Sequence, residues 1–103
     1  MLEVYPLTAA FPESERFGLI TQLRRAAASV PANIAEGSKR QHAREYARFL
    51  NIAEGSLAET EYHFMLARDL GYLAPSEASD ILEEAFELAR MLAALRLKVE
   101  QGA

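Results

Sequence analysis

Apolar residues recur every three or four positions through residues 20–37, the spacing of an amphipathic helix packed against other helices. The repeat keeps its phase across Pro31, so we expect a helix over residues 15–36 that the proline kinks rather than ends. An interior proline costs roughly 3 kcal/mol, because it removes a backbone hydrogen bond and clashes with the preceding turn. Neighbouring helices must therefore hold this segment. Its apolar positions are Ile20, Leu23, Ala27, Val30, Ile34 and Gly37.

Two later segments show the same periodicity, and a short one precedes them. Residues 2–10 are typical of the end of a first helix that stops at Phe11 and Pro12, a third helix reaches about Leu70, and a fourth begins at Pro75. Short connections make successive helices antiparallel. The sequence therefore predicts an all-α, up-down-up-down four-helix bundle with a shortened first helix and a Pro-kinked second helix. The third helix carries Leu50, Ala53, Leu57, Thr60, Phe64 and Ala67, and the fourth carries Ile81, Ala85, Leu88, Leu92, Leu95 and Val99.

Polar residues and glycines mark the expected helix ends. Ser14 can cap the second helix, and Gly37 suits the left-handed residue that follows a helix. The segment 38–41 has the spacing of a capping box that begins the third helix, and Gly71 ends that helix. A glycine in mid-helix, Gly55, costs roughly 1 kcal/mol. We therefore expect another backbone to approach the third helix closely at that point.

Composition limits the class of protein. A chain of 103 residues is long enough for one core, so we expect a single domain over residues 1–103. There is no cysteine, no N-terminal signal sequence and no apolar run long enough for a bilayer, which favours a cytoplasmic protein without membrane partners. The net charge of −4 is unevenly spread. Residues 16–48 hold seven basic and two acidic residues, whereas residues 49–103 hold four basic and ten acidic ones.

Three stretches carry a family resemblance: FGLITQLRRAAASVPANIAEG, FLNIAEGSLAETE and LARDLGYL. They resemble the four-helix-bundle proteins encoded in intervening sequences of bacterial 23S rRNA genes. The molecular role of that family is largely unassigned. Related accessory proteins of diversity-generating retroelements are barrel-like pentamers that bind nucleic acid and a reverse transcriptase, so the resemblance implies a homo-oligomer of five subunits. The family's first helix starts a dozen or more residues earlier. Here that helix either continues upstream of Met1 or is a stub that leaves part of a three-helix groove open.

A cluster of polar residues is expected where the second and third helices face each other. If the chain turns near residues 39–40, Arg24 lies level with Gly55 and Arg25 level with Glu54, while Glu59 sits a turn beyond. We hypothesise that one arginine forms a partly buried pair with one of the two glutamates. The alternative is that both arginines are exposed and contribute under about 1 kcal/mol. The family resemblance brings forward Arg24, Arg25, Ser29, Asn33, Glu36, Ser56 and Glu59. The predicted structural polar cluster is Arg24, Arg25, Asn33, Glu36, Glu54 and Glu59.

Catalytic motifs are missing from the sequence. Di-iron bundles use two Glu-x-x-His motifs, but neither His42 nor His63 follows a glutamate by three positions. The pair Glu59 and His63 could bind a metal only weakly, and a solvated or hydrogen-bonded histidine is the simpler interpretation. There is no nucleophile elbow, phosphate-binding glycine loop or zinc spacing. We expect no enzyme, no metal and no cofactor.

The most distinctive surface feature is a row of arginines. Arg40, Arg44 and Arg48 are spaced by four on the expected third helix, with Lys39 beside them. Arginine binds phosphate bidentately and stacks on bases, so this row favours weak, multivalent binding of RNA or DNA. The alternative is a protein-binding adaptor without nucleic-acid affinity, whose open groove accepts a partner helix. The acidic net charge favours the adaptor, and the arginine row and the family resemblance favour nucleic acid.

The fourth helix carries more apolar surface than one core requires. A stripe about 100° wide is enough to face a core, yet a second stripe lies beside the first. Self-association is the simplest way to cover it, because homo-oligomers dominate soluble assemblies. The predicted oligomer interface is Leu82, Phe86, Ala89 and Ala93.

Overall fold

The computed structural model describes residues 3–102 of the chain. This part contains four α-helices and one 3-10 turn. Leu2, the first residue of the helical segment expected over residues 2–10, lies outside this range. The prediction of an all-helical four-helix bundle with a short first helix is confirmed. The elements are α1 (Val4–Ala9), the 3-10 turn η1 (Glu13–Glu15), α2 (Leu19–Ser38), α3 (Ala43–Asp69) and α4 (Pro75–Gln101).

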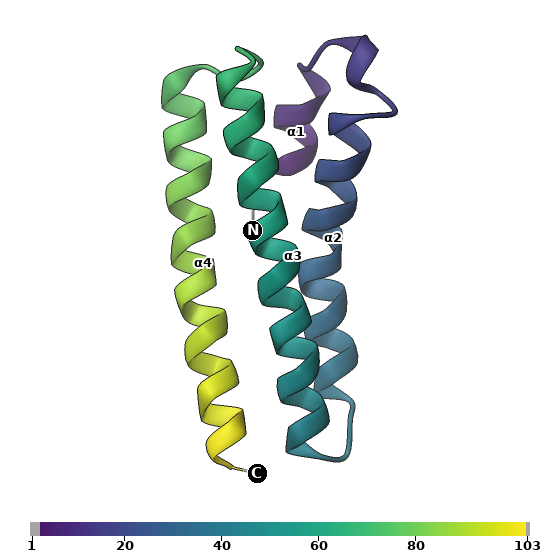
Figure 1. Ribbon diagram of the computed structural model, residues 1–103, viewed down its shortest axis with the longest axis vertical. Helices are drawn as coiled ribbons and strands as arrows, with labels where there is room; N and C mark the ends of the chain where they lie inside the picture. Colours follow the sequence, from purple (N-terminus) through teal and green to yellow (C-terminus); the bar gives the residue numbers. More distant parts are fainter. Residues whose placement is uncertain (1–2, 103) are drawn as a thin grey trace.

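The three long helices lie side by side along the long axis of the molecule, with α3 between the other two (Figure 1). The α2–α3 connection is at one end and the α3–α4 connection at the other. α3 packs against both α2 and α4, and α1 packs against α2. The Cα atoms extend over 45 × 24 × 16 Å. None of the helices in residues 3–102 has both the length and the apolar character needed to cross a bilayer.

The core consists of two clusters along the bundle. The first is centred on Leu23 and Phe64, both fully buried, and includes Val4 of α1. The second is centred on Leu50 and Leu57 and has no member from α1. Several apolar side chains packed against this second cluster are only partly buried: Ile34, Tyr46, Leu88, Leu95 and Val99.

The second helix runs through its proline as predicted. Pro31 lies inside α2, which continues for seven residues beyond it; the kink itself stays a prediction. The start of the helix differs from the prediction, because α2 begins at Leu19 and not at residue 15. Ser14 lies in the 3-10 turn η1, and the side chain that reaches the first amide of α2 is that of Glu15. Its carboxylate accepts hydrogen bonds from the Leu19 amide (3.4 Å) and from the Tyr72 hydroxyl (2.8 Å).

The α2–α3 connection also differs from the prediction. Gly37 is a helical residue of α2, and α3 begins at Ala43, so the expected capping box over residues 38–41 is absent from the described structure. The Ser38 hydroxyl instead donates to the Ala35 carbonyl (2.8 Å) within the last turn of α2. The third helix therefore starts later than the sequence indicates.

The end of α3 has the predicted form. Gly71 has a φ of +79°, the left-handed conformation that glycine adopts without strain. The Tyr72 amide donates back to the Ala67 carbonyl (2.9 Å), as in a Schellman motif. The close approach expected at Gly55 is wrong, because a Cβ atom there would have no heavy atom within 4 Å. Gly55 faces open space.

Candidate functional site

α2 and α3 approach each other closely where Gly37 faces Phe49. A Cβ atom at position 37 would lie 2.6 Å from the Phe49 Cβ and 3.0 Å from the Tyr46 Cδ1. Carbon atoms normally pack at about 3.5–4.0 Å, so a residue with a side chain does not fit at position 37. Glycine therefore serves close packing here, and not the helix end that the sequence suggested.

The ring of Phe49 holds two arginines. The Arg40 guanidinium carbon lies 4.8 Å from the ring centroid and that of Arg48 lies 5.8 Å away, both within cation–π range. Arg40 also pairs with Glu36 (3.5 Å). The prediction that Arg40 belongs to one helical face with Arg44 is wrong, because Arg40 precedes α3. Phe49, rather than helical spacing, brings Arg40 close to Arg48.

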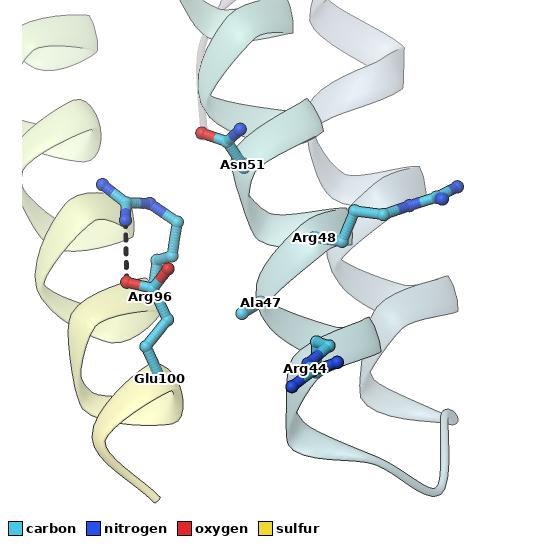
Figure 2. A pocket seen from close by; sticks show the side chains of 6 residues that line it. All are labelled: Arg44, Ala47, Arg48, Asn51, Arg96 and Glu100. Atoms are coloured by element: carbon cyan, nitrogen blue, oxygen red, sulfur yellow. Dashed lines mark hydrogen bonds and ion pairs between the residues drawn. The ribbon is translucent and has the colours of Figure 1, made fainter. Parts of the chain in front are cut away.

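A hollow of about 490 Å³ opens between α3 and α4 at the same end of the bundle. Figure 2 shows Arg44 and Arg48 projecting from α3 and Arg96 from α4, with the Arg48 side chain directed away from α4. Arg48 thus belongs both to the hollow and to the group around Phe49. The other lining residues are Ala47, Asn51 and Glu100.

The arginines of this hollow differ in their electrostatic surroundings. Arg96 is paired with Glu54 of α3 and with Glu100 one turn along α4 (2.9 Å). The hydrogen bond that Arg96 donates to Glu54, together with the negative charges of Glu54 and Glu100, raises the pKa of Arg96, although desolvation of the guanidinium acts in the opposite direction. Arg44 and Arg48 are exposed and form no ion pair within residues 3–102. These two guanidinium groups are therefore the ones free to bind an external anion.

We call the set of Arg40, Arg44, Arg48 and Arg96 the arginine band. Lys39, also exposed, is adjacent to Arg40 at the end of α2. The sequence identified Lys39 and three members of the band but missed Arg96. The four-residue spacing between Arg96 and Glu100 was a signal for the ion pair of these two residues within α4. Nothing in the sequence indicated that Arg96 lies beside Glu54 of α3.

The family model described as 23S rRNA-intervening sequence protein matches residues 1–94. This chain belongs to that family. A solved structure supports the same assignment: the crystal structure of a protein of unknown function from the S23 ribosomal protein family of Bacteroides thetaiotaomicron. It is similar to this chain with a TM-score of 0.80 and 26% sequence identity, covering 90% of this chain and 84% of that one. No curated protein matches.

The polar cluster of this family member forms in a different register from the predicted one. The facing hydroxyls of Ser29 and Ser56 lie 2.8 Å apart, so α2 is displaced by about six residues from the expected alignment with α3. The cause is that Gly37 stays helical and α3 begins only after His42. Asn33 completes this contact by donating to the Ser29 carbonyl (2.8 Å) and hydroxyl (2.9 Å).

The predicted ion pair between Arg24 or Arg25 and Glu54 or Glu59 does not form, and Arg24 and the two glutamates contact other residues instead. Arg24 donates from Nε to the buried Thr8 hydroxyl (2.9 Å), and its guanidinium lies 4.5 Å from the Tyr5 ring centroid. Arg24 therefore links α2 to α1 through these two contacts. Arg25 is exposed, and the carboxylate of Glu54 pairs with an arginine of α4.

A carboxylate oxygen of Glu59 instead lies 3.6 Å from His63 Nε2, one turn along α3, and the two groups form an ion pair only when the histidine is protonated. His63 is buried rather than solvated, and neither of its ring nitrogens has a hydrogen-bond partner within the described residues. Its ring packs edge-on against Tyr62, with centroids 5.5 Å apart. Residues 3–102 contain no group of three or more histidine or carboxylate side chains that could hold a metal ion.

The four residues of the predicted oligomer interface differ in their exposure to solvent. Leu82 is buried in the first core cluster, so its assignment to an external face is wrong. Ala89 is partly buried against the second cluster, and Ala93 is also partly buried. Phe86 is 40% exposed and Leu97 is 51% exposed, three helical turns further along α4. An exposed apolar strip thus exists on α4, but it is narrower than predicted.

Proposed function

We propose that this protein is a non-catalytic, oligomeric helical scaffold that binds the phosphate backbone of RNA or DNA through its arginine band. The observation that supports this most is the pair Arg44 and Arg48, which are exposed, form no ion pair with another of residues 3–102, and line a hollow of about 490 Å³. A guanidinium group can bind a phosphate through two parallel hydrogen bonds. Phe49 restrains the guanidinium groups of Arg40 and Arg48, which lowers the entropic cost of binding.

The affinity of one protomer is expected to be low. Arg96 is neutralised by two carboxylates and Arg40 shares its charge with Glu36, while the whole chain carries −4. A few phosphate contacts give weak binding that falls steeply with salt. An oligomer would carry one arginine band per subunit, so a nucleic acid bound to one band would meet the others at a high effective concentration. The overall affinity of the oligomer would then exceed that of a single subunit. The oligomer is therefore part of the proposed binding mechanism.

The variant R40A/R44A/R48A should lose most of its affinity for a structured RNA. Removing three cations removes about three phosphate contacts, so we expect at least a tenfold loss at about 50 mM salt. Fluorescence anisotropy with a labelled RNA hairpin, and with a labelled DNA duplex, measures the change. The matched control is R16A/R25A/R68A, which has the same net charge but alters exposed positions outside the band. An equal loss in both variants would indicate a general charge effect and refute the assigned site.

Self-association is expected to involve the exposed strip on α4. Phe86→Glu places a charge on that strip, so it should dissociate subunits while the helical circular dichroism is retained. The control is Ile52→Glu, a substitution on α3 at a side chain of nearly equal exposure, 41% against 40%. Light scattering on a sizing column measures the mass. A native mass of 11.4 kDa at micromolar concentration would contradict the oligomer outright.

A further inference from the structure

The hollow between α3 and α4 contains more than the cations that bind phosphate. Arg44 and Asn51 belong to α3, and Ala47, whose side chain is a single methyl group, lies between them (Figure 2). Arg96 and Glu100 line the same hollow from α4. Its volume of about 490 Å³ is within the range of roughly 300–1,000 Å³ that is usual for small-ligand pockets. The hollow therefore has room for a ligand of the size of one nucleotide.

Asn51 offers a hydrogen-bonding group that phosphate binding does not require. Its side chain is exposed, and its amide forms no hydrogen bond with another of residues 3–102. An amide presents an acceptor oxygen beside a donor NH₂ group, and this pair is complementary to the N6 amino group and N7 of adenine. Guanine presents two acceptors, N7 and O6, and suits arginine instead. Asn51 therefore favours adenine among the purines.

Arg96 supplies a flat surface rather than a free charge. Its guanidinium is paired with Glu54 and with Glu100 (2.9 Å), so its charge is already neutralised. The same two contacts restrain the plane of the guanidinium, and the Arg96 side chain is still 24% exposed. Unpaired bases stack on arginine guanidinium planes, whereas a base within a duplex is already stacked on its neighbours. Arg96 is therefore suited to an unpaired base.

We infer that this hollow binds one unpaired adenine nucleotide of a nucleic-acid strand. Arg44 binds the phosphate, the base stacks on Arg96, and Asn51 hydrogen-bonds to the edge of the adenine. This inference rests on the proposed function, since the arginine band holds the rest of the strand. It adds a preference for an unpaired base over a paired one and for adenine over other bases.

Two RNA strands of about seven nucleotides serve as matched probes. Both consist of uridine except at the centre, where one carries adenosine and the other carries purine riboside, which lacks the exocyclic amino group. By fluorescence anisotropy at about 50 mM salt, the adenosine strand should bind at least about fivefold more tightly. In a hairpin stem, exchanging A·U pairs for G·C pairs should leave the affinity unchanged within about twofold, because paired bases do not enter the hollow.

Amide substitutions test the location. Asn51→Ala should remove the preference, so that both strands bind with the affinity of the purine strand. Gln41→Ala is the matched control, since Gln41 is also an exposed amide and is adjacent to Arg40, but it does not line the hollow. This control should keep the preference. Arg96→Lys retains the charge but not the flat group, so it should weaken both strands to a similar extent. Circular dichroism checks that each variant is folded.

The outcomes separate this inference from the function on which it rests. Equal binding of the two strands by the native protein, with binding still lost in R40A/R44A/R48A, would overturn the inference and leave the proposed function standing. A preference that survives Asn51→Ala would place the adenine elsewhere. Adenosine monophosphate that competes at the same concentration as the strand would make a free nucleotide the ligand. Absence of binding by every strand and hairpin would contradict the proposed function as well.

Discussion

Replacing Phe64 by alanine should lower the free energy of unfolding by about 3–5 kcal/mol, the usual cost of truncating a buried phenylalanine. Phe64 has no exposed surface and joins α3 to residues of α2 and α4 in the first core cluster, including Leu23 and Ile81. Its removal leaves a cavity at the point where three helices meet. Urea unfolding followed by circular dichroism measures the loss.

The control for this substitution is Phe17→Ala. Phe17 is 87% exposed, so the same chemical change there should alter the free energy of unfolding by no more than about 0.5 kcal/mol. Similar losses at both positions would mean that the first core cluster is not packed as described. The comparison separates burial from residue type.

Replacing Gly37 by alanine should destabilise the protein by about 2 kcal/mol, even though alanine is the better helix former. The new Cβ would lie 2.6 Å from the Phe49 Cβ, an atom attached directly to the backbone of α3. Relief therefore requires the two helices to separate. For a domain of this size the melting temperature should fall by roughly 10 °C.

Gly55→Ala is the matched control for Gly37→Ala and should have the opposite sign. Gly55 is in the middle of α3, and a Cβ atom there would meet nothing within 4 Å. The substitution should therefore stabilise the protein by about 0.5–1 kcal/mol through helix propensity alone. If thermal unfolding showed both substitutions to be stabilising, the close approach at Gly37 would be refuted.

These two glycines also show which parts of the fold could be predicted from sequence. The spacing of apolar residues along a helix indicates which side chains face the core. The apolar stripes of α3 and α4 predicted that Leu50, Leu57, Phe64 and Leu92 are buried, and all four are buried. A glycine has no such pattern. Whether it ends a helix, permits close packing or faces solvent depends on the neighbouring helix, which the local sequence does not specify.

The helix register was the main source of error in the candidate site. A capping signal at residues 38–41 competed with close packing at Gly37, and the packing prevailed, so α3 starts only at Ala43. The alignment of α2 with α3 moved accordingly, and Arg24 met Thr8 instead of a glutamate. Arg96 was missed because its place beside Glu54 depends on how α3 and α4 pack. Long-range pairs of this kind are set by tertiary packing.

The salt dependence of RNA binding by the native protein tests the central claim most directly. The exposed cations Lys39, Arg40, Arg44 and Arg48 offer about four phosphate contacts per protomer. The logarithm of the association constant should therefore fall with the logarithm of salt concentration at a slope of roughly 3 to 4, or more steeply for an oligomer. Anisotropy titrations of a labelled RNA hairpin between about 50 and 200 mM salt give this slope. A steep fall is the predicted result. Absence of binding by micromolar protein at about 50 mM salt, or binding insensitive to salt, would contradict the proposed role of the arginine band.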